Sequence, residues 1–392
     1  MTDANDIIII GAGAAGLMCA LEATRLGCRV KVIDGNGLVG KKIRISGGGR
    51  CNFTHLGADK ANYLSENPDF CVSALKRFPP EAMVAWMEAR GLEYNEKTPG
   101  QLFCSGARDL VAVLERECEA GHVELCLSEP VLAVEKKGDI FEVLTKHKHL
   151  CRAVVVATGG LSYASLGASD LGYRIARQFD LRVTTLYPGL VPLKVNDKGI
   201  HAMSGVSIKA RVTSGGRSFL DNVLFTHRGL SGPAILQISS YWREGEPLHI
   251  DCWPDGDVLC FLQSKVDNAH KSLKTLLGEN LPKAFIDYSI ENAGRPFKQY
   301  SMADKERLQA TLHDWTLVPT RDSFDKAEVT CGGVDTRQIS SKTFECLSVA
   351  GLYFVGEVLD VTGQLGGYNL QWAWASGLLA GRAIGAAYKP RP

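Results

Sequence analysis

The twelve cysteines of this 392-residue sequence include no Cys-x-x-Cys pair and no cysteine–histidine spacing typical of a metal site. Paired spacing of that kind is what a disulfide framework, a zinc site or a redox-active dithiol motif needs. The sequence therefore predicts reduced thiols, most of them buried in the core, and no metal.

An excess of charge of one sign is also missing, because 44 lysines and arginines oppose 43 aspartates and glutamates, for a net charge of +1. Proteins that bind nucleic acid usually present a basic field. We therefore expect a small-molecule substrate and consider nucleic acid an unlikely partner, with only local basic patches left open. Nothing in the sequence predicts an oligomeric state.

Long apolar runs are absent from the N-terminal region, where Ile7–Ile10 is short and follows Asp3 and Asp6 rather than basic residues. Such a run is too short to cross a bilayer and lacks the basic region of a signal peptide. We expect no membrane span and a cytoplasmic location. The length and the 45% hydrophobic content are typical of a compact soluble protein of about two or three domains.

The sequence does contain a nucleotide-binding pattern at its start. Four isoleucines lead into Gly11, Gly13 and Gly16 and then into a helical stretch rich in alanine and leucine. In a strand–turn–helix unit, the first glycine permits the tight turn, the second lets the backbone approach a pyrophosphate, and the third allows close helix packing. The pattern predicts a dinucleotide site.

A second strand, Arg29 to Ile33, ends in Asp34, which follows Gly16 by 18 residues. An acid about 20 residues after the glycines accepts a ribose hydroxyl in such folds. A carboxylate there also disfavours a 2′-phosphate, so FAD or NAD fits better than NADP.

Two further apolar strands run into small residues. The strand Arg152–Ala157 ends in Thr158 and Gly159, and Leu352–Val355 ends in Gly356. Buried parallel strands end in this way where a ligand lies at the carboxyl edge of a sheet. We expect both strands to join the nucleotide-binding sheet.

The C-terminal run Asn369–Ala387 predicts a helix in which Ala373, Gly377 and Gly381 form a stripe of small residues. A membrane dimer face is one interpretation. Arg382 and the short apolar length favour close packing on the sheet instead.

The stretch SGGGRCN, residues 46–52, has three consecutive glycines that leave one side of the backbone without Cβ atoms. We expect Ser46, Gly47, Gly48 and Gly49 to lie against the flavin side of the dinucleotide and to offer a nest of amides to the pyrophosphate. Arg44 and Arg50 would balance phosphate charge, unless they are solvated loop residues. Cys51 is either a redox thiol or a buried structural residue, and the lack of a partner cysteine nearby in the sequence favours the structural role.

The blocks GAGAAG, KKIRISGGGRCN, ATGG, FTHRGLSGPAIL, VTCGGVD and GEVLDVTGQLGGYNLQWAWASG together resemble the BaiN-like, or aminoacetone-oxidase-type, bacterial FAD-dependent oxidoreductases. The resemblance runs from Ile7 to about Ala387. It implies an α/β fold with a Rossmann-like FAD-binding domain of glutathione-reductase type, interrupted by a β-barrel that carries a nested helical subdomain. Cys331 departs from the family pattern, either as a packing variation or as a reactive thiol, and packing is the favoured interpretation.

The resemblance also implies FAD contacts from Ala14, Asp34, Val131, Glu357, Asn369 and Leu370, with Glu357 on the ribityl hydroxyls and the helix near Asn369 aimed at the flavin pyrimidine ring. The complete expected cofactor site comprises Gly11, Gly13, Ala14, Gly16, Asp34, Arg44, Ser46, Gly47, Gly48, Gly49, Arg50, Val131, Thr158, Gly159, Gly356, Glu357, Gly367, Asn369 and Leu370.

The domain boundaries follow from changes in residue pattern. Residues 1–190 and 336–392 are expected to form the FAD domain. Strand-like alternation assigns 191–257 and 316–335 to the β-barrel insert, and helical periodicity assigns 258–315 to the helical subdomain.

His227, in FTHRGLSGPAIL, is the candidate catalytic residue because imidazole titrates near neutral pH, and the neighbouring Arg228 can hold a carboxylate. The alternative is that both residues order a turn.

The predicted function is hydride transfer between flavin N5 and a small organic substrate. We find no second strand followed by a Gly-x-Gly-x-x-Gly turn, so any NAD(P)H would act as a transient reductant in the substrate pocket. Three alternatives stay open: an oxygen-using amine or aminoketone oxidase, an NAD(P)H-fed ene-type reductase, and a non-catalytic FAD-containing module that binds RNA or protein through lysines such as Lys265 and Lys271.

Overall fold

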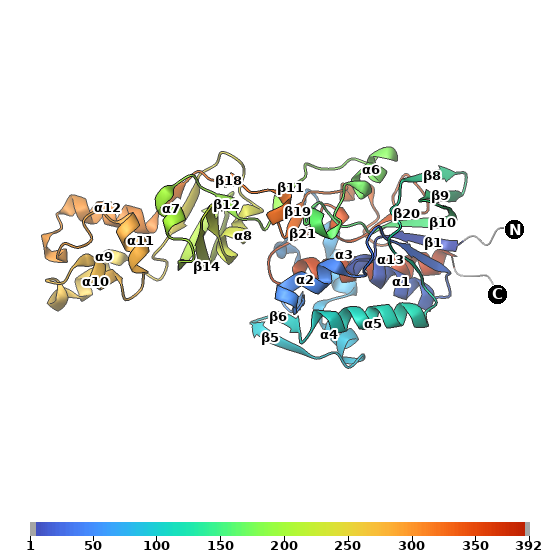
Figure 1. The fold of residues 1–392 in the computed structure, drawn as a ribbon, viewed down its shortest axis with the longest axis horizontal. Coiled ribbons are helices and arrows are strands. Elements are labelled where there is room, and N and C mark those ends of the chain that lie inside the picture. Colours follow the sequence, from blue (N-terminus) through green and yellow to red (C-terminus); the bar gives the residue numbers. More distant parts are fainter. Residues whose placement is uncertain (1–4, 389–392) are drawn as a thin grey trace. The chain divides into compact units, whose positions relative to one another are not determined.

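The computed structural model of the chain describes residues 5–388 and divides into two compact units (Figure 1). One unit comprises the chain up to Tyr187 together with the chain from Val329 onward, and the other comprises Pro188–Glu328. Each unit encloses its own cluster of buried apolar side chains.

The first unit is built on a seven-stranded mixed sheet in the order β7-β2-β1-β10-β9-β8, with β20 paired to the last part of β10. Ile7–Ile10 of β1 pairs in parallel with Ala153–Val156 of β10 on one side and with Val30–Ile33 of β2 on the other. These apolar runs are buried on both faces, as expected for central parallel strands. The strands are β1 (Asn5–Ile10), β2 (Val30–Ile33), β7 (Glu124–Cys126), β8 (Ala133–Lys137), β9 (Ile140–Leu144), β10 (Lys148–Val156) and β20 (Leu352–Phe354).

Helices α1 (Ala14–Arg25) and α13 (Tyr368–Tyr388) pack against each other at backbone distance. A Cβ atom at Gly377 would lie 2.2 Å from the carbonyl oxygen of Ala15, and one at Gly381 would lie 2.5 Å from that of Cys19. The prediction that the small-residue stripe packs on the sheet was therefore wrong in its partner. The stripe contacts α1, because glycines four residues apart let two helices approach closely.

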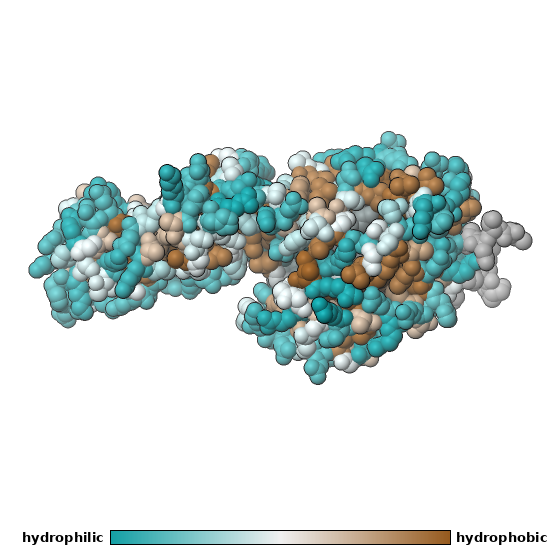
Figure 2. Space-filling view, in the orientation of Figure 1, coloured by the Kyte–Doolittle hydropathy of each residue, from teal (hydrophilic) through white to brown (hydrophobic). Residues whose placement is uncertain are grey.

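The remaining elements of this unit surround the sheet. The helices are α2 (Lys41–Gly49), α3 (Phe70–Arg77), α4 (Pro80–Glu88), α5 (Ala107–Ala120), α6 (Leu171–Gln178), η1 (Lys60–Asn62), η2 (Ala164–Leu166), η6 (Thr336–Gln338) and η7 (Gly356–Val358). The strands are β3 (Asn52–His55), β4 (Tyr63–Leu64), β5 (Tyr94–Thr98), β6 (Gln101–Cys104), β19 (Val329–Cys331) and β21 (Thr362–Gly363), and β11 (Tyr187–Gly189) begins at the last residue of the first segment. In Figure 2, apolar residues gather on the face of this unit near the labels of α2 and α13 in Figure 1.

The segment 329–335, which the sequence analysis assigns to the insert, packs with the first unit. Val334 forms bridges with Val183 and Leu359, and a Cβ atom at Gly333 would lie 2.5 Å from the backbone of Leu359. The chain thus rejoins the first unit at Val329, the first residue of VTCGGVD, and not after this block.

The second unit contains a seven-strand ladder in the order β17-β16-β13-β14-β15-β12-β18. The two end strands are separated along the chain by Val318 and Pro319 alone, so one segment pairs with β16 at its start and with β12 at its end. This segment closes the ladder into the predicted barrel. The strands are β12 (Leu193–Lys194), β13 (Ser207–Ser214), β14 (Arg217–Thr226), β15 (Gly229–Ser231), β16 (Leu248–Asp251), β17 (Trp315–Leu317) and β18 (Thr320–Arg321).

The same unit carries a run of short helices after β16, where the sequence predicts the helical subdomain. Side-chain caps start three of them: Asp257 for α9, Ser272 for α10 and Ser301 for α12. The helices of this unit are α7 (Lys198–Ala202), α8 (Pro233–Ser239), α9 (Val258–Ser264), α10 (Leu273–Leu277), α11 (Lys283–Ser289), α12 (Met302–His313), η3 (Val266–Asn268), η4 (Phe297–Gln299) and η5 (Phe324–Lys326). Between residues 5 and 388, none of the helices has the length and apolar character needed to span a bilayer.

Candidate functional site

The turn between β1 and α1 has the backbone geometry of a nucleotide-binding turn. Gly11 has φ +115°, and a Cβ atom there would lie 2.4 Å from the carbonyl oxygen of Ala157. A Cβ atom at Gly16 would lie 2.0 Å from the carbonyl oxygen of Gly11, whereas one at Gly13 would meet nothing within 4 Å. Gly11 and Gly16 are therefore needed for packing, and Gly13 leaves open space at the start of α1, which begins at Ala14.

Asp34 is held beside this turn at the end of β2. Its carboxylate accepts hydrogen bonds from the amides of Ala12 and Asn36, both at 2.7 Å. A carboxylate oxygen has a second lone pair, so both oxygens can still accept a hydroxyl. The position is suited to a ribose.

Val131 lies near Asp34, although it follows Asp34 by 97 positions in the chain, because the segment before β8 is hydrogen-bonded to the end of β2. The amide of Glu129 donates to the carbonyl of Asp34 at 3.0 Å, and the next residue, Pro130, is the nearest neighbour of a Cβ atom placed at Gly35. Val131 itself is buried and lies two positions before the start of β8.

The glycine loop occupies the second half of α2, which is regular only as far as Ile45. Ser46 is extended, with φ −59° and ψ 146°, and Gly47, Gly48 and Gly49 have φ of +56°, +68° and +83°. Residues with a side chain rarely adopt a left-handed backbone conformation, and three in succession therefore require glycine. A Cβ atom at Gly48 would meet nothing within 4 Å, so the loop leaves open space on one side.

The two arginines of this loop differ in their surroundings. Arg44 donates to the carbonyl of Val39 at 3.0 Å and pairs with Glu115 of α5 at 3.4 Å, so it ties α2 to its neighbours. Arg50 is exposed, and between residues 5 and 388 no hydrogen bond or ion pair is found for its side chain. Ser46 donates its hydroxyl to the carbonyl of Ile43. Of the three, Arg50 is the side chain that is free to meet an anion.

The end of the glycine loop meets the start of α13, so two blocks about 315 residues apart in the chain become neighbours. A Cβ atom at Gly367 would lie 2.6 Å from the backbone of Thr54 and 2.7 Å from Asn52 Oδ1. The Asn369 side chain accepts from the amide of Gly363 at 2.8 Å and donates to its carbonyl. It thus shapes the loop before α13, and Leu370 follows it, half-buried, in the first turn.

Glu357 lies where four segments converge. Its Oε1 accepts the amide of Thr330 at 3.0 Å, and its Oε2 pairs with Lys42 Nζ at 2.8 Å. A Cβ atom at Gly160 would lie 2.9 Å from Glu357 Oε1, and one at Gly159 would lie 3.8 Å from Oε2. The carboxylate is therefore fixed against the end of β10.

Gly356 and Thr158 have packing roles in the same region. Gly356 has φ +75°, and a Cβ atom there would lie 2.9 Å from the side chain of Ala15 in α1. Thr158 Oγ1 would lie 2.3 Å from a Cβ atom at Gly172, so α6 begins against it.

Lys42 was not predicted as a site residue, although it joins α2 to Glu357 and lies 5.9 Å from the ring centre of Tyr163. Thr330 was not predicted either, and its hydroxyl accepts a hydrogen bond from the amide of Leu161 at 2.7 Å. No spacing in the sequence relates residue 42 to residue 357. The only available signal was the basic pair Lys41–Lys42 at the start of the glycine block.

His227 lies in the second unit, exposed at the turn between β14 and β15. The Thr226 hydroxyl donates to the carbonyl of Gly229 at 3.1 Å and accepts the amide of Arg228 at 3.3 Å, which fixes the turn. Arg228 pairs with the buried carboxylate of Asp322 at 3.2 Å. The other predicted site residues are all in the first unit.

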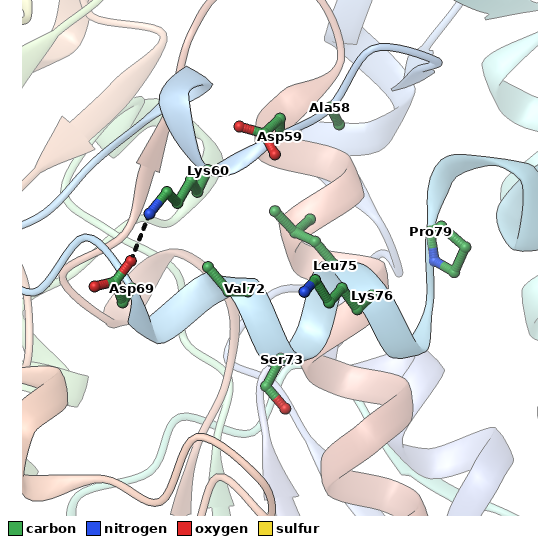
Figure 3. A pocket seen from close by; sticks show the side chains of 9 residues that line it. All are labelled: Ala58, Asp59, Lys60, Asp69, Val72, Ser73, Leu75, Lys76 and Pro79. Atoms are coloured by element: carbon green, nitrogen blue, oxygen red, sulfur yellow. Dashed lines mark hydrogen bonds and ion pairs between the residues drawn. The ribbon is translucent and has the colours of Figure 1, made fainter.

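A pocket of about 690 Å³ lies elsewhere on the first unit, between η1 and α3 (Figure 3). Its floor includes Val72 and Leu75, and at its rim Lys60 pairs with Asp69 at 2.8 Å. None of its lining residues belongs to the predicted cofactor site. The pocket is therefore not part of the predicted cofactor site.

Taken together, the ends of β1, β2, β10 and β20, the glycine loop and the first turn of α13 bring the predicted cofactor residues to one edge of the parallel sheet. This is the edge at which such sheets bind nucleotides. The open positions at Gly13 and Gly48 and the two acids, Asp34 and Glu357, fit FAD.

A family model described as "HI0933-like protein Rossmann domain" matches residues 5–383. The chain belongs to the HI0933-like Rossmann family. It is an FAD-dependent oxidoreductase, as the sequence motifs predict, and the resemblance to BaiN-like proteins is confirmed.

Two relatives align with this chain over nearly their whole lengths, and the chain is compared with each in turn. It is 46% identical to the ribosomal RNA dihydrouridine synthase of Escherichia coli (strain K12), over 95% of this chain and 96% of the relative. It is 30% identical to the 3-dehydro-bile acid delta(4,6)-reductase of Clostridium scindens, over 98% of this chain and 100% of the relative. Among solved structures, 3-ketosteroid delta1-dehydrogenase from Sterolibacterium denitrificans aligns over 98% of this chain and 100% of its own, with a TM-score of 0.56 and 15% identity, which supports the fold alone.

Proposed function

We propose that this HI0933-like protein reduces uridine to dihydrouridine in ribosomal RNA, with NAD(P)H as the electron source. The observation that carries the proposal is the 46% identity to a protein named ribosomal RNA dihydrouridine synthase, extending over 95% of the chain. A protein of the same name from Haemophilus influenzae is 43% identical over 96% of the chain. These names weigh against the expectation from net charge that nucleic acid is an unlikely partner.

The reaction class has support from a second relative. A dihydrouridine synthase and a delta(4,6)-reductase both, by their names, reduce a carbon–carbon double bond. In uridine, the C5–C6 bond is conjugated to a carbonyl, so hydride addition at C6 places negative charge on that oxygen before C5 takes a proton. This shared chemistry favours a reductase over the amine or aminoketone oxidase.

When bound, FAD supplies the hydride for the double bond. The chain's own groups would hold it: Asp34 would bind the adenosine ribose and Glu357 the ribityl hydroxyls, while Gly13 and Gly48 leave the backbone open to the dinucleotide. Lys42 would keep the Glu357 carboxylate in place, because its ammonium group is the ion-pair partner of that carboxylate.

The test uses ribosomal RNA transcribed in vitro, which lacks dihydrouridine. The purified protein is incubated with this RNA, FAD and either NADH or NADPH without oxygen, and the RNA is then digested to nucleosides. We expect a nucleoside that is heavier than uridine by two hydrogens, and faster bleaching of the flavin by one of the two nicotinamides. If the nicotinamides bleach the flavin but this nucleoside does not form, the result would contradict RNA as the substrate and would leave the assignment as a reductase intact.

A small conjugated ketone is the second candidate substrate, because the delta(4,6)-reductase is related over its whole length. The same incubation with a 4,6-dienone steroid in place of RNA distinguishes the two. Turnover of the dienone alone would replace RNA as the substrate.

We propose His227 as the catalytic side chain, since its exposed position on a turn fixed by Thr226 leaves the imidazole accessible to substrate. His227→Ala is expected to slow product formation while FAD content stays normal. The matched control is His201→Ala, because that imidazole is already bonded to the carbonyl of Val195 at 2.7 Å. Equal rates for His227→Ala and the unmodified protein would remove His227 from the mechanism.

A further inference from the structure

The fold gives Cys51 the partner cysteine that the sequence lacks. Cys51 directly precedes β3, and Cys104 ends β6, which pairs with β3 in antiparallel fashion. Asn52 and Phe103 are partners across this ladder, so Cys51 and Cys104 are opposite each other one step further along. The amide of Cys104 donates to the carbonyl of Cys51 at 3.1 Å.

The two thiols also interact directly. Interaction with the Cys51 side chain, together with burial, raises the pKa of the Cys104 thiol. Both are free cysteines. Opposite residues of an antiparallel pair have Cα atoms about 4.5–5.5 Å apart, which is within the range that a disulfide spans.

The position of the pair places it beside the glycine loop. Cys51 follows the three-glycine loop after a single residue, Arg50, and has a left-handed backbone with φ +50°. Phe103, the neighbour of Cys104, lies 3.0 Å from a Cβ atom placed at Gly47. A bond between the two sulfurs would therefore tie the end of the glycine loop to β6.

We propose that Cys51 and Cys104 form a thiol pair that hydrogen peroxide converts into a disulfide, fixing the glycine loop to β6. The sulfur of Cys51 attacks hydrogen peroxide, its S–O bond forms as the O–O bond breaks, and the released hydroxide takes the Cys51 thiol proton and leaves as water. The Cys104 sulfur then attacks the sulfenic sulfur, the S–S bond forms as the S–O bond breaks, and the released hydroxide takes the Cys104 thiol proton and leaves as a second water. Two thiols are oxidised to one disulfide and one hydrogen peroxide is reduced to two waters, and a thiol reductant reverses the change.

The first test is peptide mapping of the full-length Cys260→Ser variant, in which the exposed cysteine that would form bonds between molecules is removed. The protein is treated with hydrogen peroxide, blocked with an alkylating agent under denaturing conditions, and digested with trypsin. We expect peptides 51–60 and 98–108 to be joined, with a mass lower than their sum by two hydrogens, and to separate on reduction.

Single substitutions make the result specific. Cys51→Ser and Cys104→Ser should each abolish the joined peptide, whereas Cys19→Ser, which changes another buried cysteine of the same unit, should not. Peroxide that oxidises other cysteines but leaves peptides 51–60 and 98–108 separate would overturn the proposal.

The second test measures release of FAD from oxidised and reduced protein. A tied loop is expected to release FAD more slowly, with the difference lost in Cys51→Ser. An unchanged release rate in protein that contains the joined peptide would overturn the action of the bond on the loop. This readout rests on the proposed placement of FAD, whereas the peptide map does not, so the two can fail separately.

Discussion

At the scale of single residues, Asp34 combines a structural and a proposed binding role, because its carboxylate fixes Ala12 in the glycine turn and still has lone pairs for a ribose. Asp34→Ala is expected to weaken FAD binding by roughly 1.5–3 kcal/mol, the range for a hydrogen bond to a charged group. The measurement is a fluorescence titration with FAD. The control is Asp139→Ala, which removes an exposed carboxylate from the β8–β9 turn. Equal affinities of both variants would place the ribose acid elsewhere.

Asp360 is a buried carboxyl group whose charge should cost stability. Burial raises its pKa from 3.8 to about 6, and its carboxylate accepts the amide of Glu66 at 2.8 Å. Because the folded-state pKa is the higher one, the cost is absent below pH 4, grows between pH 4 and 6, and is complete above that range.

Asp360→Asn removes this charge and keeps an oxygen for the Glu66 amide. It is expected to raise the free energy of unfolding at pH 8 by at most about 3 kcal/mol, and by almost nothing at pH 4, in urea denaturation. Asp335→Asn is the contrasting variant, since it removes a carboxylate that pairs with Arg182 at 2.8 Å and should lower stability at pH 8. A gain for Asp360→Asn that is the same at both pH values would show that the charge is not its origin.

At the scale of elements, the contact between α1 and α13 depends on glycine. A Cβ atom at Gly377 would overlap the carbonyl of Ala15, so Gly377→Ala must push the helices apart. We expect a loss of about 1–3 kcal/mol of stability, or more, as for other overpacked sites. The control is Ala386→Leu, on an exposed position of the same helix. The measurement is chemical denaturation, and a loss no larger than that of the control would mean that the helices adjust freely.

The same elements show how far the sequence could predict the structure. The runs of isoleucine in β1 and of valine in β10 predict buried parallel strands from their composition alone. The spacing of the glycines in the first turn is required by few structures other than a nucleotide-binding turn. The partner of α13 was not predictable from its stripe, because small residues indicate close packing without saying what lies opposite. The pairs Lys42–Glu357 and Cys51–Cys104 depend on how strands and helices are brought together over 315 and 53 residues of chain.

At the scale of the whole molecule, two separate cores predict two unfolding transitions. Each unit has its own buried tryptophans, Trp372 and Trp374 in the first and Trp242 and Trp253 in the second. FAD at 100 times its dissociation constant should stabilise the unit that binds it by about 2.7 kcal/mol and leave the other unchanged.

Thermal unfolding, followed by tryptophan fluorescence with and without FAD, measures this. Variants with Trp253→Phe or Trp374→Phe assign each transition to its unit. A single unfolding transition whose midpoint temperature rises with FAD would show that the two units do not unfold independently.

The split of the first unit around residues 188–328 also sets an order for folding during synthesis. Its sheet includes β20, and its helix α13 packs on α1, so the ribosome must make nearly the whole chain before this unit is complete. The second unit is continuous and can form its barrel as soon as β18 emerges, because domains generally fold as units during translation. The inserted unit should therefore be folded while the first unit is still incomplete, because β10 has no β20 to pair with until the segment that begins at Val329 has been made.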